Sequence, residues 1–250
     1  MSARRVTVVV PCFNEERRLQ PAGLLRLLDN PEVHLLMVDD GSADGTLAAL
    51  EALEQRAPNR IGVLGLPRNK GKAEAVRAGL REALAQGSTA VGYLDADLAT
   101  PPEEMLRLIT RLHEGPTQVV FGARVALLGR DIQRNPVRHY LGRIFASLSA
   151  LSLGLRVYDT QCGAKVFRAT DELNRALETP FASRWIFDVE LISRLLAEGL
   201  KPEHFAEVPL HTWRDVKGSS LGPVAMARAL GEVTALGVRR RLYGSGTRRR

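Results

Sequence analysis

Short apolar runs alternate with amphipathic segments through the first half of the chain. The runs have the length of β-strands, and the segments between them repeat their apolar residues with the period of an α-helix. Runs such as Leu35–Val38 are apolar at every position, which is typical of strands buried on both faces of a parallel sheet. We therefore predict a doubly wound α/β domain with a mostly parallel sheet. The predicted strands are Val6–Val10, His34–Val38, Ile61–Leu66, Ala90–Leu94 and Gln118–Phe121, and the predicted helices are Glu15–Leu28, Gly45–Gln55, Lys72–Ala85 and Pro102–Leu112.

The second half of the chain follows a different pattern. Residues 136–155 repeat their apolar positions as one long amphipathic helix does, with Leu148 and Leu151 on the apolar face. The glycine- and arginine-rich end, 244–250, is expected to be disordered. The other predicted elements are a strand over Ala164–Phe167, a helix over Phe187–Ala197 and a last helix over Val224–Leu242.

Three clusters of polar residues directly follow predicted strands. They are Asn14-Glu15 after the first strand, Asp39-Asp40-Gly41-Ser42 after the second and Asp95-Ala96-Asp97 after the fourth. In doubly wound sheets, ligands bind beyond the carboxyl ends of the strands. The sequence therefore predicts one binding site at this edge of the sheet.

The most informative of these clusters contains Asp95 and Asp97. Two carboxylates one residue apart, after a strand that is expected to be buried, are costly unless a positive charge lies between them. Mg²⁺ is usually held by one or two carboxylates together with substrate phosphates. The pattern favours a divalent cation that carries a diphosphate. A pair of surface turn residues is the alternative that the pattern alone leaves open.

The composition is that of an ordinary globular protein. The 250 residues are 45% apolar and 25% charged, which excludes wholesale disorder and suits one large α/β domain. The net charge of +7 is concentrated in residues 223–250, which contain seven Arg and one Glu, so the body is nearly neutral. This basic end lacks the interleaved aromatic residues of nucleic-acid-binding segments, and we expect no nucleic-acid partner.

Neither a secretory signal nor a membrane span is visible in the sequence. The residues after Met1 lead straight into a strand pattern, and no apolar stretch approaches the roughly 18 residues that a span needs. Cys12 and Cys162 belong to no cluster with metal-ligand spacing, so we expect two buried thiols. A cytoplasmic location follows as an expectation.

Four ordered blocks resemble the family 2 glycosyltransferases. They read VVVPCFNEE at 8–16, VDDGSADGT at 38–46, RNKGKAEAVRAG at 68–79 and YLDADLATPPEE at 93–104. In the later half, DTQCGAKVF at 159–167 and RWIFDVEL at 184–191 resemble the dolichyl-phosphate β-glucosyltransferases, with the polyprenyl-phosphate mannosyltransferases as a second match.

The resemblance implies the nucleotide-diphospho-sugar transferase fold in a single domain over residues 1–222. Its first half, 1–124, is expected to bind the nucleotide sugar, and its second half, 125–222, the acceptor. Residues 223–250 would form a C-terminal helix and a basic tail.

The resemblance also implies roles on the donor side of the site. Asp39, Pro11 and Glu15 match residues of the nucleotide pocket, and Asp95, Ala96 and Asp97 match the metal–diphosphate segment, whose cofactor would be Mg²⁺ or Mn²⁺. Lys72 is expected to contact the donor phosphates, because a cation at a positive helix end is otherwise disfavoured. Relatives carry Gly-Ser-Lys where this chain has Gly218-Ser219-Ser220, so Arg214 or Lys217 is expected to supply the missing charge.

On the acceptor side, Arg124 and Arg138 resemble a pair that holds the acceptor phosphate, since Arg binds phosphate bidentately. Asp188 matches the general base of relatives that use hydroxyl acceptors. A phosphate acceptor is already anionic, and Asp188 would then position the acceptor or a nearby Arg instead. Gln161 and Lys165 are expected to make structural contacts below the site.

The resemblance predicts an inverting transfer of a hexose to a polyprenyl or dolichyl phosphate. Ala99 stands where mannosyl relatives carry Gln, which favours UDP-glucose as the donor. The alternative is a soluble enzyme that uses GDP-mannose or another nucleotide sugar and a hydroxyl acceptor. A nucleotidyltransferase would need a glycine-rich loop after the first strand, which Pro11-Cys12-Phe13-Asn14 is not. Peripheral contact with the inner face of the membrane is expected through the helix near 137–153 and the Arg-rich end near 239–250.

Overall fold

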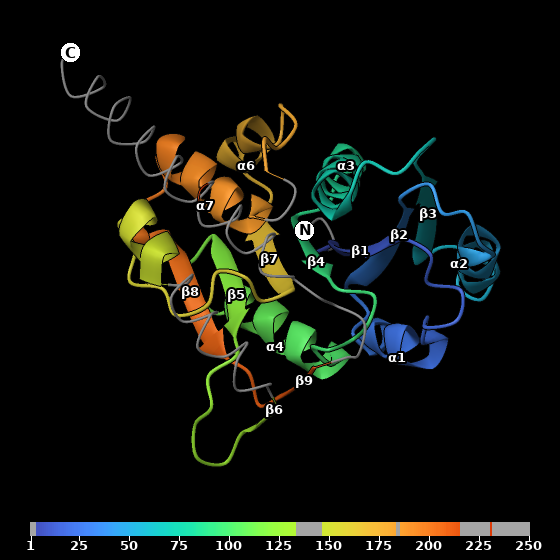
Figure 1. Ribbon diagram of the computed structural model, residues 1–250, viewed down its shortest axis with the longest axis horizontal. Coiled ribbons are helices and arrows are strands. Elements are labelled where there is room, and N and C mark those ends of the chain that lie inside the picture. Colours follow the sequence, from blue (N-terminus) through green and yellow to red (C-terminus); the bar gives the residue numbers. More distant parts are fainter. Residues whose placement is uncertain (1–3, 134–146, 184–185, 216–230, 232–250) are drawn as a thin grey trace.

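One mixed sheet forms the centre of the computed structural model, which describes residues 4–133, 147–183, 186–215 and 231. Within these residues, seven strands lie in the order β3-β2-β1-β4-β7-β5-β8, and β7 is the antiparallel member, between β4 and β5 (Figure 1). A second, two-stranded sheet pairs β6 with β9. The strands are β1 (Val6–Cys12), β2 (Val33–Asp39), β3 (Ile61–Gly65), β4 (Ala90–Leu94), β5 (Val119–Ala123), β6 (Asp131–Gln133), β7 (Ala164–Arg168), β8 (Phe205–Pro209) and β9 (Thr212–Arg214).

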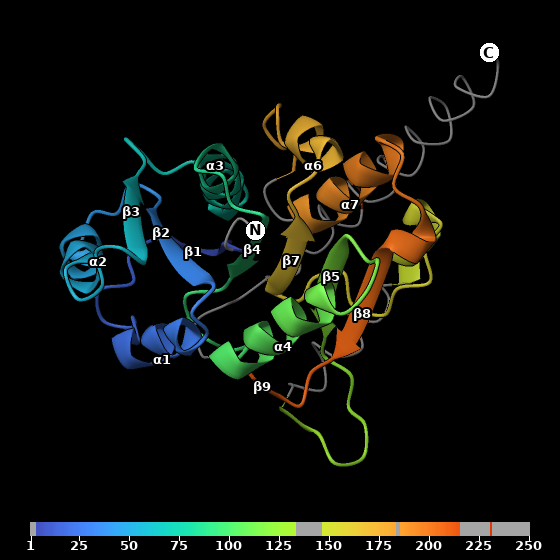
Figure 2. The same cartoon turned by 180° about the vertical axis from the view of Figure 1, so that it is seen from behind.

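Helices cover both faces of the large sheet, as a doubly wound fold requires (Figures 1 and 2). Apolar side chains of α1, α2 and α4 pack against one face, and those of α3, α6 and α7 pack against the other. The helices are α1 (Pro21–Leu25), α2 (Thr46–Glu54), α3 (Lys72–Ala85), α4 (Pro102–His113), α6 (Asp171–Ala176) and α7 (Phe187–Ala197), with short 3-10 turns η1 (Arg26–Asp29) and η2 (Pro202–His204).

The predicted α/β class and mostly parallel sheet are confirmed, with local differences. The first helix begins at Pro21 and not at Glu15, because the backbone N–H groups of Glu15 and Glu16 donate to Thr46 Oγ1 and hold this segment in a turn. The strand β8 and the helix α6 were not predicted. β8 is a half-buried edge strand, so it lacks the continuous apolar run that marks the central strands.

Only the end of the predicted helix over 136–155 falls on described residues, where 147–153 are helical. Leu148 packs against the small cluster around Leu153 and Ile186, whereas Leu151 is 68% exposed. The two leucines therefore do not share one buried face. The predicted helix over 224–242 lies outside the described residues, apart from residue 231.

Both cysteines are buried free thiols, as predicted, and burial raises the pKa of Cys12 and of Cys162. Among the described residues, none of the helices combines the length and the apolar character that crossing a bilayer would take.

Candidate active site

The loops that follow β1 and β2 are bonded to each other at the carboxyl edge of the sheet. Asn14, which has a left-handed backbone (φ 53°), accepts from the N–H of Ala43 at 2.9 Å, and its own N–H donates to Ser42 Oγ at 3.0 Å. The N–H of Glu15 donates to Thr46 Oγ1 at 2.8 Å. These bonds join the first two predicted polar clusters into one rim.

Asp39 and Asp40 are both buried but have different surroundings. The carboxylate of Asp40 accepts from the N–H groups of Lys70 and Gly71, at 2.8 and 2.7 Å, so it shapes the turn before α3. Asp39 accepts from the N–H of Ser42 through Oδ2, while its Oδ1 is buried and has no hydrogen-bond partner in the described structure. A buried carboxylate oxygen without a donor favours a ligand hydroxyl or N–H there. The nucleotide contact of Asp39 stays a prediction.

Lys72 is the first residue of α3 and forms an ion pair with Asp95, Nζ to Oδ1, at 2.5 Å. Its ammonium also lies 5.9 Å from the centre of the Phe187 ring. Burial alone would lower the pKa of Lys72, but the charges of Asp95 and Asp188 more than offset it, so the pKa is raised. Without a ligand, this cation therefore balances the first carboxylate of the Asp95–Asp97 pair.

Asp97 carries the second carboxylate and is less well compensated. Burial raises the pKa of Asp97, and the charge of Asp95 raises it further, although the N–H of Ala99 donates to its Oδ1 at 3.0 Å. Ala96 between them packs into the apolar core. Two carboxylates that repel each other in a partly buried setting fit a divalent cation, which would relieve the repulsion.

The described residues do not complete a metal site on their own. No group of three His, Cys, Asp or Glu side chains that could hold a metal occurs within them. Mg²⁺ commonly takes its other ligands from water and substrate phosphates, so an incomplete protein site agrees with a cation that binds together with a diphosphate.

Gly163 is packed directly against Asp95. The backbone carbonyl of Gly163 accepts from the N–H of Asp95 at 3.1 Å, and a Cβ added at this glycine would overlap the Asp95 carboxylate. We expect Gly163→Ala to reduce transferase activity about 10²-fold, since a displacement of roughly 1 Å at a reacting group has that cost. Gly62→Ala, whose new Cβ would meet Leu36 at an ordinary 3.6 Å, is the control in a steady-state assay. Equal activity of both variants would contradict this placement of Asp95.

Asp188, near the start of α7, lies in a buried polar network beneath the site. Lys165 of β7 donates from Nζ to Asp188 Oδ1 at 2.6 Å and to the carbonyl of Cys162 at 2.6 Å. The hydroxyl of Tyr93 also donates to Asp188 Oδ1. Lys165 is fully buried, and the carboxylate of Asp188 balances its charge. The prediction that Lys165 makes a contact below the site agrees with this geometry.

Arg124, at the end of β5, is already paired with a carboxylate. Its Nε and Nη2 donate to Asp159 at 2.6 and 2.8 Å, and its guanidinium lies 5.3 Å from the centre of the Trp213 ring. Burial alone would lower the pKa of Arg124, and Asp159 more than offsets this, so the pKa is raised. Glu207 of β8 holds Asp159 in place by accepting from its N–H at 2.6 Å. An acceptor phosphate at Arg124, which stays a prediction, would share the guanidinium with Asp159.

The remaining predicted residues are spread around this centre. Pro11 is the last residue but one of β1 and lies beyond Val9, the last residue that pairs with β4, so its missing N–H leaves that ladder intact. Glu15 forms an ion pair with Arg18 at 2.7 Å, and burial raises the pKa of Glu15. Arg214 is 71% exposed and pairs with Asp131 at 3.2 Å, while its backbone N–H donates to the carbonyl of Ala99. Its contact with a diphosphate stays a prediction.

Arg138 and Lys217 lie outside the described residues. The charged side chains of the site are electrostatically coupled. The charge of Asp97 adds to burial in raising the pKa of Glu15, and the charge of Lys72 opposes the rise in the pKa of Asp97. The charge of Asp95 adds to that of Asp159 in raising the pKa of Arg124. Sequence reasoning missed Tyr93 and Asp159, the partners of Asp188 and Arg124. The signal for Tyr93 was a polar group at the end of a buried strand, which needs a hydrogen-bond partner.

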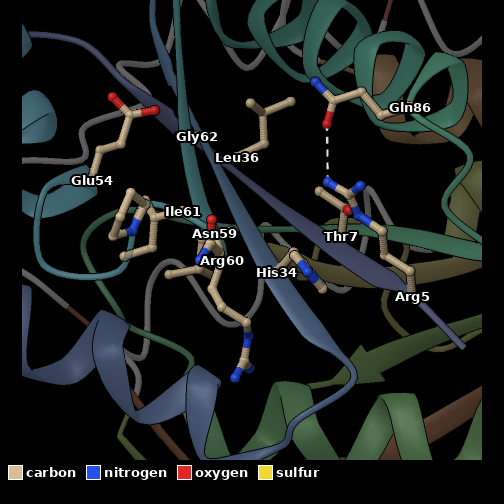
Figure 3. A pocket seen from close by; sticks show the side chains of 12 residues that line it. Arg5, Thr7, His34, Leu36, Glu54, Asn59, Arg60, Ile61, Gly62 and Gln86 are labelled. Atoms are coloured by element: carbon tan, nitrogen blue, oxygen red, sulfur yellow. Dashed lines mark hydrogen bonds between the residues drawn. The ribbon is translucent and has the colours of Figure 1, made fainter. Parts of the chain in front are cut away.

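A hollow of about 180 Å³ lies at the opposite edge of the sheet, near the amino ends of β1, β2 and β3 (Figure 3). Arg5 crosses it to donate to Gln86 at 3.1 Å. Arg60 donates to the backbone carbonyls of Asn30 and Val33, so its guanidinium stabilises the fold at this edge. None of the predicted site residues lines this hollow, and it belongs to the scaffold of the first three strands.

Solved structures and curated sequences resemble the whole chain. Glucosyl-3-phosphoglycerate synthase from Mycobacterium tuberculosis, in complex with UDP, aligns with a TM-score of 0.69 at 20% identity, over 95% of this chain and 81% of that one. A complex of the same enzyme with Mn²⁺, UDP and phosphoglyceric acid aligns with a TM-score of 0.68 at 22% identity, over 96% of this chain and 79% of that one. These structures confirm the predicted nucleotide-sugar transferase fold.

A dolichyl-phosphate β-glucosyltransferase of Trichomonas vaginalis is 33% identical, over 88% of this chain and 68% of that protein. The polyprenol monophosphomannose synthase of Mycolicibacterium smegmatis is 28% identical, over 96% of this chain and 89% of that protein. The model of the glycosyl transferase family 2 matches residues 7–173. The chain therefore belongs to glycosyl transferase family 2 and is a glycosyltransferase.

Proposed function

We propose that this glycosyltransferase moves glucose from UDP-glucose to a polyprenyl phosphate with the help of Mg²⁺ or Mn²⁺. The observation that carries the donor half of this proposal is the Asp95–Asp97 pair at the carboxyl edge of the sheet, with Lys72 bonded to Asp95. Support for the lipid-phosphate acceptor comes from the relatives, which are named for transfer to dolichyl phosphate or polyprenol phosphate.

The residues of the donor half would divide the work as follows. Asp39, whose Oδ1 has no partner among the described residues, would accept a hydrogen bond from the nucleotide, and Pro11 and Glu15 would form the rest of that pocket. Asp97 and Asp95 would hold the cation, and Lys72 would contact the diphosphate. A bound cation would neutralise the charge that grows on the departing diphosphate. Ala99, in place of a Gln, supports glucose as the sugar.

On the acceptor side, Asp188 is better suited to positioning than to proton removal. Its Oδ1 accepts from both Lys165 and Tyr93, and the ion pair with Lys165 would be disrupted if Asp188 took a proton. A phosphate oxygen needs no base, because it is already anionic. Arg124 then contacts the acceptor phosphate from the end of β5. We assign residues 1–124 to the donor and 125–222 to the acceptor.

A transfer assay tests this function. Purified protein with Mn²⁺ or Mg²⁺ is given UDP-glucose or GDP-mannose, with and without a polyprenyl phosphate. We expect a glucosyl phosphate lipid from UDP-glucose. Transfer from GDP-mannose but not from UDP-glucose would contradict the assignment of glucose as the sugar, and it would not contradict the polyprenyl phosphate as the acceptor. Transfer only to a hydroxyl acceptor, abolished in Asp188→Asn, would replace the proposal with a soluble transferase in which Asp188 is the base.

A further inference from the structure

Two leucines stand exposed at the tip of the loop between β5 and β6, residues 124–130. Leu127 is 49% exposed and Leu128 is fully exposed, although side chains of this type are usually covered. The loop extends away from the body of the domain and carries them beyond it (Figures 1 and 2). Exposed apolar side chains at such a tip lower the solubility of the protein unless they contact another apolar surface.

The tip has a defined conformation that keeps the leucines outside. Residues 127–130, which we name the apolar turn, are closed by the N–H of Arg130 donating to the carbonyl of Leu127 at 3.1 Å. Gly129 has a φ of 78°, a conformation in which a residue with a side chain is strained, so the turn needs glycine there. The N–H of Leu127 donates to the carbonyl of Val125 within the loop, and the N–H of Val125 donates to the carbonyl of Ala123 at the end of β5, each at 3.0 Å. These backbone hydrogen bonds lower the free-energy cost of moving the loop out of water.

The charges around the apolar turn are those of a segment that meets an anionic surface. Residues 125–130 contain one cation, Arg130, and no acid, while the charge of Arg124 is balanced by Asp159. Asp131, the next residue, pairs with Arg214 at 3.2 Å, so its charge is balanced. Cationic residues next to exposed leucines are typical of contacts with anionic lipid, where each basic residue contributes attraction.

The loop also has the reach to connect a bilayer with the site. Leu128 is four positions beyond Arg124, a distance of at most about 14 Å when the chain is extended. The headgroup layer of one leaflet is about 5 to 8 Å deep. When Leu128 lies at the boundary of the hydrocarbon region, Arg124 can therefore lie at the depth of the lipid phosphates.

We propose that the apolar turn inserts Leu127 and Leu128 into the headgroup region of an anionic membrane and so brings Arg124 to the phosphate of its lipid acceptor. The second clause rests on the proposed function, whereas the insertion does not. The occupant is a lipid surface, and a second copy of the chain or a protein partner is an outcome that the test separates from it.

The test compares Leu127→Ser/Leu128→Ser with wild type and with Leu47→Ser, an exposed leucine of α2 away from this loop. Vesicles of phosphatidylcholine with phosphatidylglycerol are added without any sugar nucleotide, and bound protein is measured by sedimentation. We expect the double variant to bind at least about tenfold more weakly, because each leucine loses much of its transfer free energy. Leu47→Ser should bind as wild type does. Leu128→Trp should shift its emission to shorter wavelength on vesicles, relative to the wild-type spectrum.

Equal binding by the double variant and wild type, or no emission shift in Leu128→Trp, would overturn the insertion. So would a double variant that changes the oligomeric state in solution but not the binding to vesicles. A short polyprenyl phosphate that dissolves in water separates this proposal from the proposed function. Both proteins should glucosylate it equally, while the double variant falls behind on a long acceptor in vesicles. If wild type glucosylates neither acceptor, the proposed function fails and the vesicle binding still decides the insertion.

Discussion

Replacing Asp97 by asparagine is expected to reduce sugar transfer by about 10²- to 10³-fold, the cost of removing one preorganised group that stabilises transition-state charge. The two side chains have nearly the same shape, so the variant removes the negative charge and keeps the packing. Asp97 is the carboxylate whose pKa burial and Asp95 raise, and among the described residues it forms no ion pair like that of Asp95 with Lys72. Steady-state kinetics with saturating Mn²⁺ and donor measure the loss.

The control for this variant is Asp171→Asn, in the first turn of α6, which removes an exposed acid away from the carboxyl edge of the sheet. We expect its activity to equal that of wild type. Thermal unfolding of Asp97→Asn should match or exceed that of wild type, because the variant removes a repulsion. Activity of Asp97→Asn within a factor of two or three of wild type would mean that the catalytic charge lies elsewhere.

Replacing Lys165 by methionine is expected to cost about 3 to 5 kcal/mol of the free energy of unfolding, the typical cost of leaving a buried charge without its partner. Lys165 is fully buried, and its ammonium donates to both Asp188 and the carbonyl of Cys162. Methionine fills much of the same volume but removes the ammonium that pairs with Asp188, which keeps the hydrogen bond from the Tyr93 hydroxyl. Denaturant unfolding followed by circular dichroism measures the difference.

The double variant Lys165→Met/Asp188→Asn separates charge from packing. It removes both charges, so we expect it to regain a large part of the lost stability while transfer stays low, because the acid that positions the acceptor is gone. Lys201→Met, at an exposed lysine, should be neutral. A loss below about 1 kcal/mol for Lys165→Met would show that the pair is not the buried unit described here.

The local pattern predicted the central strands, because burial on both faces leaves a continuous apolar run. It did not predict the place of β7. A strand-like segment such as Ala164–Phe167 looks the same whether its neighbours are parallel or antiparallel, and pairing with β4 and β5 is decided by tertiary packing. The edge strand β8 was missed because its half-buried residues lack that run.

The sequence predicted which polar residues of the candidate site lie at strand ends. It did not predict which of them form ion pairs or hydrogen bonds with each other. Lys72 forms an ion pair with Asp95 that the sequence did not indicate, because α3 begins beside the end of β4, and its contact with the donor phosphates stays a prediction. Asp188 and Lys165 are 23 residues apart and meet only when α7 packs on β7. Such partners depend on distances in the fold that sequence spacing does not encode.

The most direct test of the metal–diphosphate assignment is a calorimetric titration of UDP into the protein with and without Mn²⁺. We predict that Mn²⁺ strengthens UDP binding at least about tenfold in wild type, since Asp95 and Asp97 would hold the cation and its charge would stabilise the diphosphate. In Asp97→Asn, the two titrations should give nearly the same affinity. An affinity of wild type for UDP that does not change with Mn²⁺, or the same Mn²⁺ effect in Asp97→Asn, would contradict the assignment of Asp95 and Asp97 to the metal.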